Sequence, residues 1–373
     1  MEEYKTYTLE ELSIGKGSYG IAASAVPFDT SLHTYLRITD INDDGTLNKS
    51  GLMSVDEDEA GKYLLKPNDI VFARTGNSTG RSYFYDGSDG ELVYAGFLIK
   101  FSLDNAKVNP RILKYYTHSK PYYDWIQSFG TGSTRGNINA KTYGNMPITL
   151  PPRDIQDKIV DVLKSLDDKI EVNKRINDNL EQQAIALFDM MFPTIASGED
   201  IIGNVIIPKR GKGLLSKDAV EGNVPVVAGG LEPATYHNES NTVAPVVTIS
   251  ASGANAGFVN LWQIPVWSSD SSFIDASMTK YVYFWYVMLK KRQKEIFDAQ
   301  TGSAQPHIYP KHIAEMPMGN FEQSDVEKFT EIVTPMFEIR GRNLKESERL
   351  SSIRDSLLPK LMSGELKLNE VNV

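Results

Sequence analysis

The sequence predicts an α+β protein made of two mixed α/β domains that are related by pseudo-two-fold symmetry and separated by two long antiparallel coiled-coil helices. The first observation behind this prediction is a repeated motif: residues 131–147 read TGSTRGNINAKTYGNMP and residues 301–317 read TGSAQPHIYPKHIAEMP. Seven of the 17 positions are identical without a gap. Because solenoid units span only roughly 20 to 50 residues, a period of 170 residues indicates a duplicated domain.

The second observation is a pair of long amphipathic segments with the same 170-residue offset. Their apolar positions alternate spacings of four and three residues, which is the pattern of a coiled-coil seam. The first seam runs through Ile159, Leu163, Leu166, Ile170, Asn173, Asn177, Leu180, Ala184, Leu187 and Met191. The second runs through Phe329, Val333, Met336, Arg340, Asn343, Ser347, Leu350, Arg354, Leu357 and Leu361.

The polar interruptions of the two seams coincide, because Asn173 aligns with Asn343 and Asn177 with Ser347. A buried Asn in a seam lowers stability but fixes the register and the partner of a helix. We therefore predict that the two helices pack on each other in antiparallel orientation, with these four residues setting the register of the pair. The alternative is that each helix lies independently on its own domain.

Each repeat begins with short runs rich in β-branched and aromatic residues, bounded by Gly, Asp and Asn, which predict strands. They lie at 35–41, 69–76, 81–87 and 92–101, and again at 224–230, 244–253, 256–262 and 264–269. Helical stretches follow at 111–129 and 279–297, and Pro121 breaks or begins a helix in the first of them. The predicted divisions are a first domain (1–152), a central long spacer helix (153–192), a second domain (193–321) and a C-terminal long spacer helix with a tail (322–373).

Two smaller repeats support the duplication. Gly15-Lys16-Gly17 recurs as Gly211-Lys212-Gly213, and a pair of glycines spaced four apart, Gly76 and Gly80, recurs as Gly253 and Gly257. Glycines at such positions indicate tight turns or a close approach of the backbone.

Composition excludes several classes of protein. The net charge of −9 argues against a protein that coats nucleic acid through bulk positive charge, although it allows local basic faces. Without cysteine there is no disulfide framework and no thiolate metal site. The acidic N-terminus is not a signal peptide, and the longest apolar stretch, 281–289, is too short to span a bilayer. We therefore expect a cytoplasmic protein that does not bind membranes.

Motifs for catalysis are missing from the sequence. It contains no N/D-P-P-Y/F motif of adenine methyltransferases, no G-x-G-x-x-G after a strand and no Walker A loop. The five histidines form no H-x-x-x-H pair, so we expect no metal site.

The run from Gly132 to Arg135, followed by Ile138, Met146-Pro147-Ile148, Leu150-Pro151-Pro152, Gln156 and Ile159, resembles the specificity subunits of type I restriction–modification systems. The second copy matches this pattern at Gly302-Ser303-Ala304-Gln305, His307-Ile308 and Met316-Pro317. It departs where Gly319-Asn320-Phe321 replaces Leu-Pro-Pro.

The resemblance implies two target-recognition domains, each of which reads one half of a bipartite, gapped site in double-stranded DNA. It also implies that the helix pair sets the gap and docks two methyltransferase (M) subunits, and that restriction/translocase (R) subunits join through the complex. The specificity subunit itself would be non-catalytic and would hold no cofactor, because S-adenosylmethionine and ATP would be bound by the partner subunits. The alternative is a two-domain protein scaffold without DNA readout.

Candidate DNA-binding residues are polar side chains in or beside the Gly-rich turns, since Arg and Lys read guanine, Asn and Gln read adenine, and all of them can contact phosphates. In the first half they are Lys16, Arg74, Asn77, Arg81, Arg135, Asn137 and Lys141. In the second half they are Lys209, Arg210, Lys212, Asn255, Gln305, His307 and Lys311.

Positions that differ between the repeats are the best candidates for base contacts, because the two halves would read different sequences. Arg135 aligns with Gln305 and Asn137 with His307, whereas Lys141 and Lys311 are the same residue and can instead brace each domain against its helix. The alternative for each candidate is a solvated surface charge or a polar group that stabilises the turn. The aromatic runs at 115–125 and 283–286 are expected in the core rather than as platforms that stack on bases.

Overall fold

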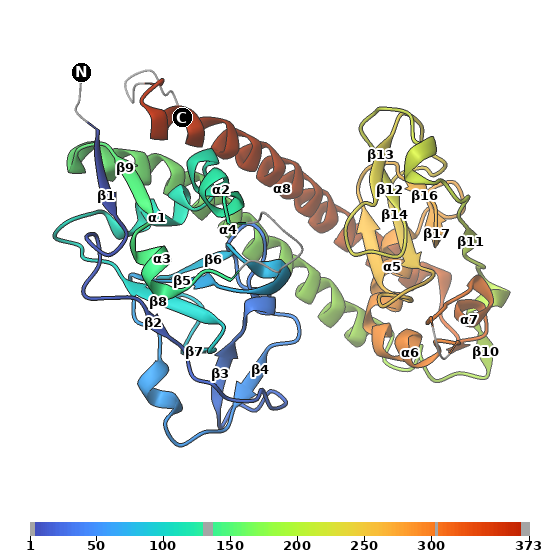
Figure 1. Cartoon of the computed structure of the whole chain (residues 1–373). Helices are drawn as coiled ribbons and strands as arrows, with labels where there is room; N and C mark the ends of the chain where they lie inside the picture. The colour runs from blue at the N-terminus through green and yellow to red at the C-terminus, as the bar shows by residue number, and fades with distance from the viewer. Residues whose placement is uncertain (1–3, 130–136, 303–304, 367–373) are drawn as a thin grey trace. The chain divides into compact units, whose positions relative to one another are not determined.

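The computed structural model describes residues 4–129, 137–302 and 305–366 (Figure 1). The chain divides into two units, Met1–Asp168 with Leu350–Val373 (unit 1), and Lys169–Arg349 (unit 2). Two long helices, α4 (Arg153–Met191) and α8 (Gln323–Ser363), contribute one part to each unit. We call the strand-rich part of unit 1 the first domain and that of unit 2 the second domain.

The first domain contains three sheets, with strand orders β2-β8-β5-β6, β4-β3-β7 and β1-β9. Its strands are β1 (Lys5–Thr8), β2 (Ser18–Tyr19), β3 (His33–Leu36), β4 (Met53–Val55), β5 (Asp69–Ala73), β6 (Ser82–Tyr85), β7 (Leu92–Tyr94), β8 (Leu98–Ser102) and β9 (Pro147–Leu150). Its helices are α1 (Pro110–Tyr116), α2 (Lys120–Gln127) and α3 (Ala140–Gly144). Pro121 lies in the first turn of α2, so it begins a helix rather than breaking one.

The second domain has sheets of order β11-β17-β14-β15, β13-β12-β16 and β10-β18. Its strands are β10 (Asp200–Ile201), β11 (Lys209–Arg210), β12 (Val224–Val227), β13 (Thr235–His237), β14 (Val246–Ser250), β15 (Val259–Trp262), β16 (Trp267–Ser268), β17 (Ser271–Asp275) and β18 (Pro317–Met318). Its helices are α5 (Val282–Lys291), α6 (Gln293–Asp298) and α7 (Pro310–Ala314).

The two domains share one topology. Each four-stranded sheet is antiparallel throughout, and its two inner strands have direct counterparts, β8 in β17 and β5 in β14. Each three-stranded sheet contains one parallel pair, β3 with β7 in the first domain and β12 with β16 in the second. The duplication inferred from the repeated motif therefore extends over every sheet.

Both domains build their cores together with the long helices. In unit 2, Phe188 of α4 and Phe329 of α8 pack on each other and on Phe284 of α5, with ring centroids 5.5 to 6.3 Å apart. In unit 1, Leu163 of α4 and Leu361 of α8 belong to the cluster of buried residues that also contains much of α1. Most of the aromatic residues expected in the core are buried there, including Tyr115, Tyr116 and Tyr122 and all four residues of 283–286, but Tyr123 is 43% exposed.

The two helices pack on each other in antiparallel orientation, as predicted, so the alternative of two independent helices is wrong. All twenty predicted seam positions are buried or half-buried. Within unit 2, Asn173 contacts Ser347 while Phe188 contacts Phe329, so the partner's number falls as the residue number rises. Asn343 Nδ2 donates to Asn177 Oδ1 at 2.9 Å, and Asn173 Nδ2 donates to Glu346 Oε2 at 2.8 Å.

Three details differ from the sequence analysis. The apolar run 92–101 is two strands, β7 and β8, because the chain turns between them at residues 95–97. The inner strand β17 (Ser271–Asp275) was not predicted, since it is rich in Ser and Asp. The described residues include no helix that is long and apolar enough to cross a membrane.

The third difference is that the repeat of Gly-Lys-Gly is not structural. Strand register makes Gly211 the equivalent of Gly20 rather than of Gly15. Tyr19 pairs with Ile99 of β8 in the same way as Arg210 pairs with Ser272 of β17. At both glycines a Cβ atom would meet a backbone carbonyl oxygen, at 2.1 Å beside Gly20 and at 2.4 Å beside Gly211. The requirement for glycine therefore belongs to the residue after β2 and after β11.

Candidate nucleic-acid interface

Each domain brings its repeated motif against the end of an inner strand. In the first domain, the Ile138 amide donates to Arg74 O at 3.0 Å, and Thr75 bridges Asn137. In the second, the Ile308 amide donates to Ala251 O at 2.9 Å, and Ser252 bridges His307. The same backbone pairing thus joins the motif to the turn after β5 and to the turn after β14.

These turns need their glycines. Gly76 and Gly80 have φ of +73° and +90°, and Gly253 and Gly257 have φ of +83° and +89°. Such angles are readily available only to glycine. A Cβ at Gly80 would lie 2.7 Å from Ile126 Cγ2, and one at Gly257 would lie 2.9 Å from Ile296 Cγ2. The repeat of paired glycines seen in the sequence is therefore a real structural repeat.

In the first domain the turn carries a cationic cluster, which we call the Arg74 cluster. The Arg74 guanidinium lies 5.3 Å from the ring centroid of Tyr19 and 5.7 Å from that of Phe97. Its Nη1 donates to Asn137 Oδ1 at 3.3 Å. Tyr19 and Phe97 are 44% and 55% exposed, which is unusual for aromatic side chains, so the cluster lies at the surface.

In the second domain the corresponding place holds an ion pair, the Arg210 cluster. Arg210 Nη2 lies 2.5 Å from Asp270 Oδ1, and Ser252 Oγ donates to the other carboxylate oxygen of Asp270. The ring of His307 stacks on that of Tyr309, with centroids 5.9 Å apart and planes within 14°. Tyr309 is 41% exposed.

The residues of the two clusters occupy equivalent positions. Tyr19 and Arg210 are the second residues of β2 and β11. Phe97 and Asp270 immediately precede β8 and β17, and Arg74 and Ala251 immediately follow β5 and β14. Asn137 and His307 precede the isoleucines that bond to the strand ends. The backbone is thus the same in both places, while all four side chains differ.

The structure places the other candidates around these clusters or away from them. Lys16, Asn77 and Lys141 are exposed in the first domain, and Lys209, Lys212, Gln305 and Lys311 in the second. Asn255 is half-buried in the turn between Gly253 and Gly257. Arg135 lies outside the described residues.

Arg81 is held by its own domain. Its Nε donates to Asp43 Oδ1 at 2.6 Å, and its Nη1 donates to Ile41 O at 3.1 Å. These contacts tie the loop before β4 to the start of β6.

Sequence reasoning missed Tyr19, Phe97 and Asp270. The aromatic signal in the sequence comes from dense runs, most of whose residues lie in the core. Tyr19 and Phe97, in contrast, are isolated aromatic residues beside glycines. Asp270 belongs to a Ser-Ser-Asp-Ser stretch that gave no strand signal. Their proximity to Arg74 and Arg210 depends on pairing between strands that are distant in sequence.

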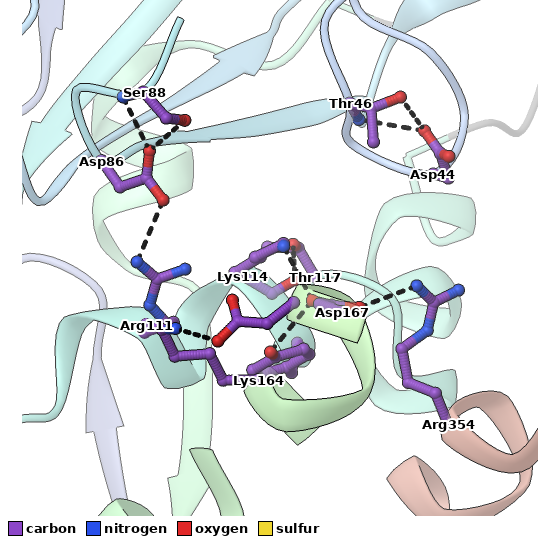
Figure 2. Close-up of polar contacts among 12 residues, drawn as sticks. Asp44, Thr46, Asp86, Ser88, Arg111, Lys114, Thr117, Lys164, Asp167 and Arg354 are labelled. Carbon is purple, nitrogen blue, oxygen red and sulfur yellow. Dashed lines mark hydrogen bonds and ion pairs between the residues drawn. The ribbon is translucent and has the colours of Figure 1, made fainter. Parts of the chain in front are cut away.

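A second polar cluster lies where α1 meets the long helices in unit 1 (Figure 2). Asp167 accepts hydrogen bonds from Lys114 Nζ at 2.8 Å, Tyr115 OH at 3.0 Å and Arg354 Nη1 at 3.0 Å. Burial by itself raises the pKa of Asp167, but the two cations outweigh it and hold that pKa below its ordinary value. The carboxylate is fully paired, so the cluster serves as an ionic joint between domain and helices.

No metal-binding arrangement accompanies these clusters in the part of the chain that the structure describes. Among those residues, no three His, Asp or Glu side chains lie close enough together to hold a metal ion. The two clusters present exposed hydrogen-bond donors, aromatic rings and cations, which can bind a ligand by recognition.

Comparison with known proteins identifies the family. Residues 1–182 match the model of the type I restriction modification DNA specificity domain. The chain is 25% identical over 300 residues to the MjaIX type I restriction enzyme specificity subunit of Methanocaldococcus jannaschii, covering 69% of each. It is 30% identical over 192 residues to the HindI specificity subunit of Haemophilus influenzae, covering 49% of this chain and 40% of that one.

The fold is similar to the crystal structure of a type I restriction–modification S subunit from M. genitalium. The TM-score is 0.55 at 20% identity, over 97% of this chain and 96% of that one. The likeness thus includes both domains and both long helices. The chain belongs to the family of type I restriction–modification specificity subunits, and it is the non-catalytic DNA specificity subunit of such a system.

Proposed function

We propose that the chain recognises a bipartite, gapped target in double-stranded DNA, with each domain reading one half. The observation that supports this most directly is the pair of equivalent clusters. One backbone arrangement carries Arg74 with two aromatic rings in the first domain, and Arg210 with Asp270 in the second. Because base edges are read by side chains, two equal scaffolds with different side chains are suited to two different half-sites.

The remaining candidates would hold the DNA backbone around each cluster, since phosphate contacts position a protein without carrying sequence information. They are Lys16, Asn77, Arg81, Lys141, Lys209, Lys212, Asn255 and Lys311, whereas Arg135 and Gln305, which differ between the repeats, remain candidates for base contacts. The dense acidic run 56–59 follows β4, in the three-stranded sheet, whereas Arg74 follows β5 in the four-stranded sheet. The acid therefore lies outside the sheet that carries the Arg74 cluster.

The helix pair would dock two M subunits, and R subunits would join through the complex. Several apolar side chains of the pair are exposed in unit 2. Val172 and Ile176 of α4 are 45% and 41% exposed, and Ile332 and Leu344 of α8 are 50% and 40% exposed. Exposed apolar residues grouped on one element are typical of protein interfaces. S-adenosylmethionine and ATP would be bound by those partners, in a complex that acts in the cytoplasm.

We assign the functional divisions as target-recognition domains at 1–152 and 193–321 and spacer helices at 153–192 and 322–373. Asn173, Asn177, Asn343 and Ser347 would fix the register of the two helices, because they form a polar layer in an otherwise largely apolar seam.

Binding by purified protein tests the proposal. The chain with its M subunit is used to select duplexes from a random-sequence pool, and the selected duplexes are then measured against scrambled ones at several salt concentrations. We expect enrichment of two fixed sequences separated by a gap of unvarying length and unspecified sequence, with affinity that falls as salt rises. Enrichment of no sequence, with equal affinity for scrambled DNA, would support a scaffold without DNA readout instead.

A further inference from the structure

The side-chain contacts in each domain carry an inference about the bases themselves, which rests on the proposed function. The Arg74 guanidinium lies beside the rings of Tyr19 and Phe97, and its Nη1 donates to Asn137. Its Nε also lies 3.4 Å from Gly96 O. A guanidinium carries five N–H donors, so these contacts leave donors without a partner among the described residues.

A long side chain loses rotamer entropy when it binds, and contacts with two rings reduce that loss by ordering it beforehand. The rings also attract the cation through their faces. Arg74 is therefore a planar set of donors that is ordered before any ligand arrives. Among the bases, guanine presents two adjacent acceptors, O6 and N7, in the major groove, and these match two parallel N–H donors of arginine.

Arg210 is ordered by a different device. Asp270 accepts from Arg210 through one oxygen and from Ser252 through the other, so the carboxylate is itself fixed. A free carboxylate here would repel a DNA phosphate, but the paired carboxylate is largely neutralised by Arg210. Arg210 is still 40% exposed in its side chain, and guanidinium donors not used by Asp270 can reach a ligand.

The two arginines come from positions that are not equivalent. The counterpart of Arg210 is Tyr19, one of the two rings that confine Arg74, and the counterpart of Arg74 is Ala251, whose small side chain carries no charge. Each cluster thus contains one ordered arginine. Arg74 immediately follows the inner strand β5 in the first domain, whereas Arg210 is the last residue of the edge strand β11 in the second.

We propose that Arg74 and Arg210 are the guanine-reading residues of the first and second half-sites, and that Tyr19, Phe97 and Asp270 are the positioning residues that order them. Each half-site then contains one guanine read by arginine. Because the arginines stand on different strands, the two guanines occupy different places relative to their domains.

Methylome sequencing of cells that express the complete complex tests this, because each half of the methylated motif is read separately. Arg74→Ala should lower the preference for one guanine in the first half-site by roughly ten- to a hundredfold and leave the second half unchanged. Arg210→Ala should do the reverse. The half-site that stays unchanged reports in each case that the variant is folded and assembled.

Pairs of substitutions at one residue distinguish a positioning role from a purely structural one. Phe97→Leu removes a ring and should weaken the preference for the same guanine as Arg74→Ala does. Phe97→Tyr retains the ring and should leave the methylated motif unchanged. Asp270→Asn should weaken the preference for guanine in the second half-site. Lys62→Ala, which removes an exposed cation that pairs with exposed Glu59, is the matched control and should change neither half.

The outcomes distinguish this inference from the proposed function. A wild-type motif with two halves but without guanine in one of them, or with both guanines intact in Arg74→Ala and Arg210→Ala, would overturn the inference alone. A wild-type complex that methylates no bipartite motif would overturn the proposed function as well.

Discussion

The side-chain amide of Asn343 on α8 donates a 2.9 Å hydrogen bond to Asn177 Oδ1 on α4. Shifted by the 170-residue repeat, this bond becomes the contact of Asn173 Nδ2 with Ser347 Oγ, which is also present, at 3.3 Å. The two contacts of the polar layer are therefore equivalent when α4 and α8 are exchanged, as expected of a duplicated helix that packs on its own copy. Only one sliding position of the two helices satisfies both contacts.

A double-mutant cycle on this bond measures its contribution to stability. Asn343→Leu leaves Asn177 Oδ1 buried without its donor and should lower the free energy of unfolding by about 1 to 3 kcal/mol. Asn177→Leu combined with Asn343→Leu replaces both partners by apolar groups and should restore most of that loss. Urea unfolding of the two single variants and the double variant checks this. Additive losses in the double variant would show that the bond does not couple the helices.

The ionic joint at Asp167 predicts a pH-dependent stability. Asp167→Ala leaves Lys114 and Arg354 without their shared partner and should destabilise the chain by on the order of 3 kcal/mol, because these groups are largely buried. The matched control is Asp168→Asn, whose exposed pair with Lys164 should contribute well under about 1 kcal/mol.

The direction of the pH effect follows from the lowered pKa of Asp167. A depressed carboxyl pKa adds stability that is complete above the ordinary value of 3.8 and is lost as pH falls through the lower folded-state pKa. Unfolding measured from pH 6 down to acid should therefore show a slope that is reduced in Asp167→Asn. An unchanged slope in that variant would assign the acid sensitivity to other carboxylates.

The glycines of the first turn should differ in their tolerance of a side chain. Gly76→Ala adds a Cβ into open space and should cost only the strain of a positive φ, roughly 1 kcal/mol. Gly80→Ala adds the same strain and a clash with Ile126, so it should cost distinctly more. Thermal unfolding compares the two, and equal midpoints would mean that Ile126 moves aside freely.

Docking of the M subunit should depend on the exposed apolar residues of the helix pair. Val172→Glu with Ile176→Glu should abolish co-purification of the M subunit, because charges would be buried in the interface. Since both side chains are exposed, unfolding of the isolated chain should hardly change. Lys174→Glu, at an exposed polar position on the same helix, is the control and should still co-purify. Retention of the M subunit by the double variant would place its binding surface elsewhere.

Much of this architecture was predictable because it repeats. The seam and its polar layer follow from residues spaced three and four apart, a local pattern that 3.6 residues per turn converts directly into one helix face. The paired glycines were predictable for the same local reason, since a positive φ is a property of the single residue. Pro121 likewise acts within one helical turn.

The clusters could be predicted only in part. Arg74 and Arg210 stood out as cations beside turns, but their partners come from strands far away in sequence: Tyr19 on β2, Phe97 before β8 and Asp270 before β17. Gly-Lys-Gly misled for a related reason, because its register is set by pairing with β8 and β17 and not by the motif itself. The contrast between Asp167 and its repeat counterpart, Phe337, also depends on tertiary contacts: one is ion-paired, and the other stacks on Tyr283 at 4.9 Å.

Methylome sequencing of cells that express the wild-type chain with its M subunit is the most direct test of the two-domain reading. We predict one methylated motif made of two fixed halves separated by a gap of constant length, together with variants of the Arg74 cluster that alter one half and variants of the Arg210 cluster that alter the other. A continuous motif, or variants of a single cluster that alter both halves together, would contradict the assignment of one half-site to each domain.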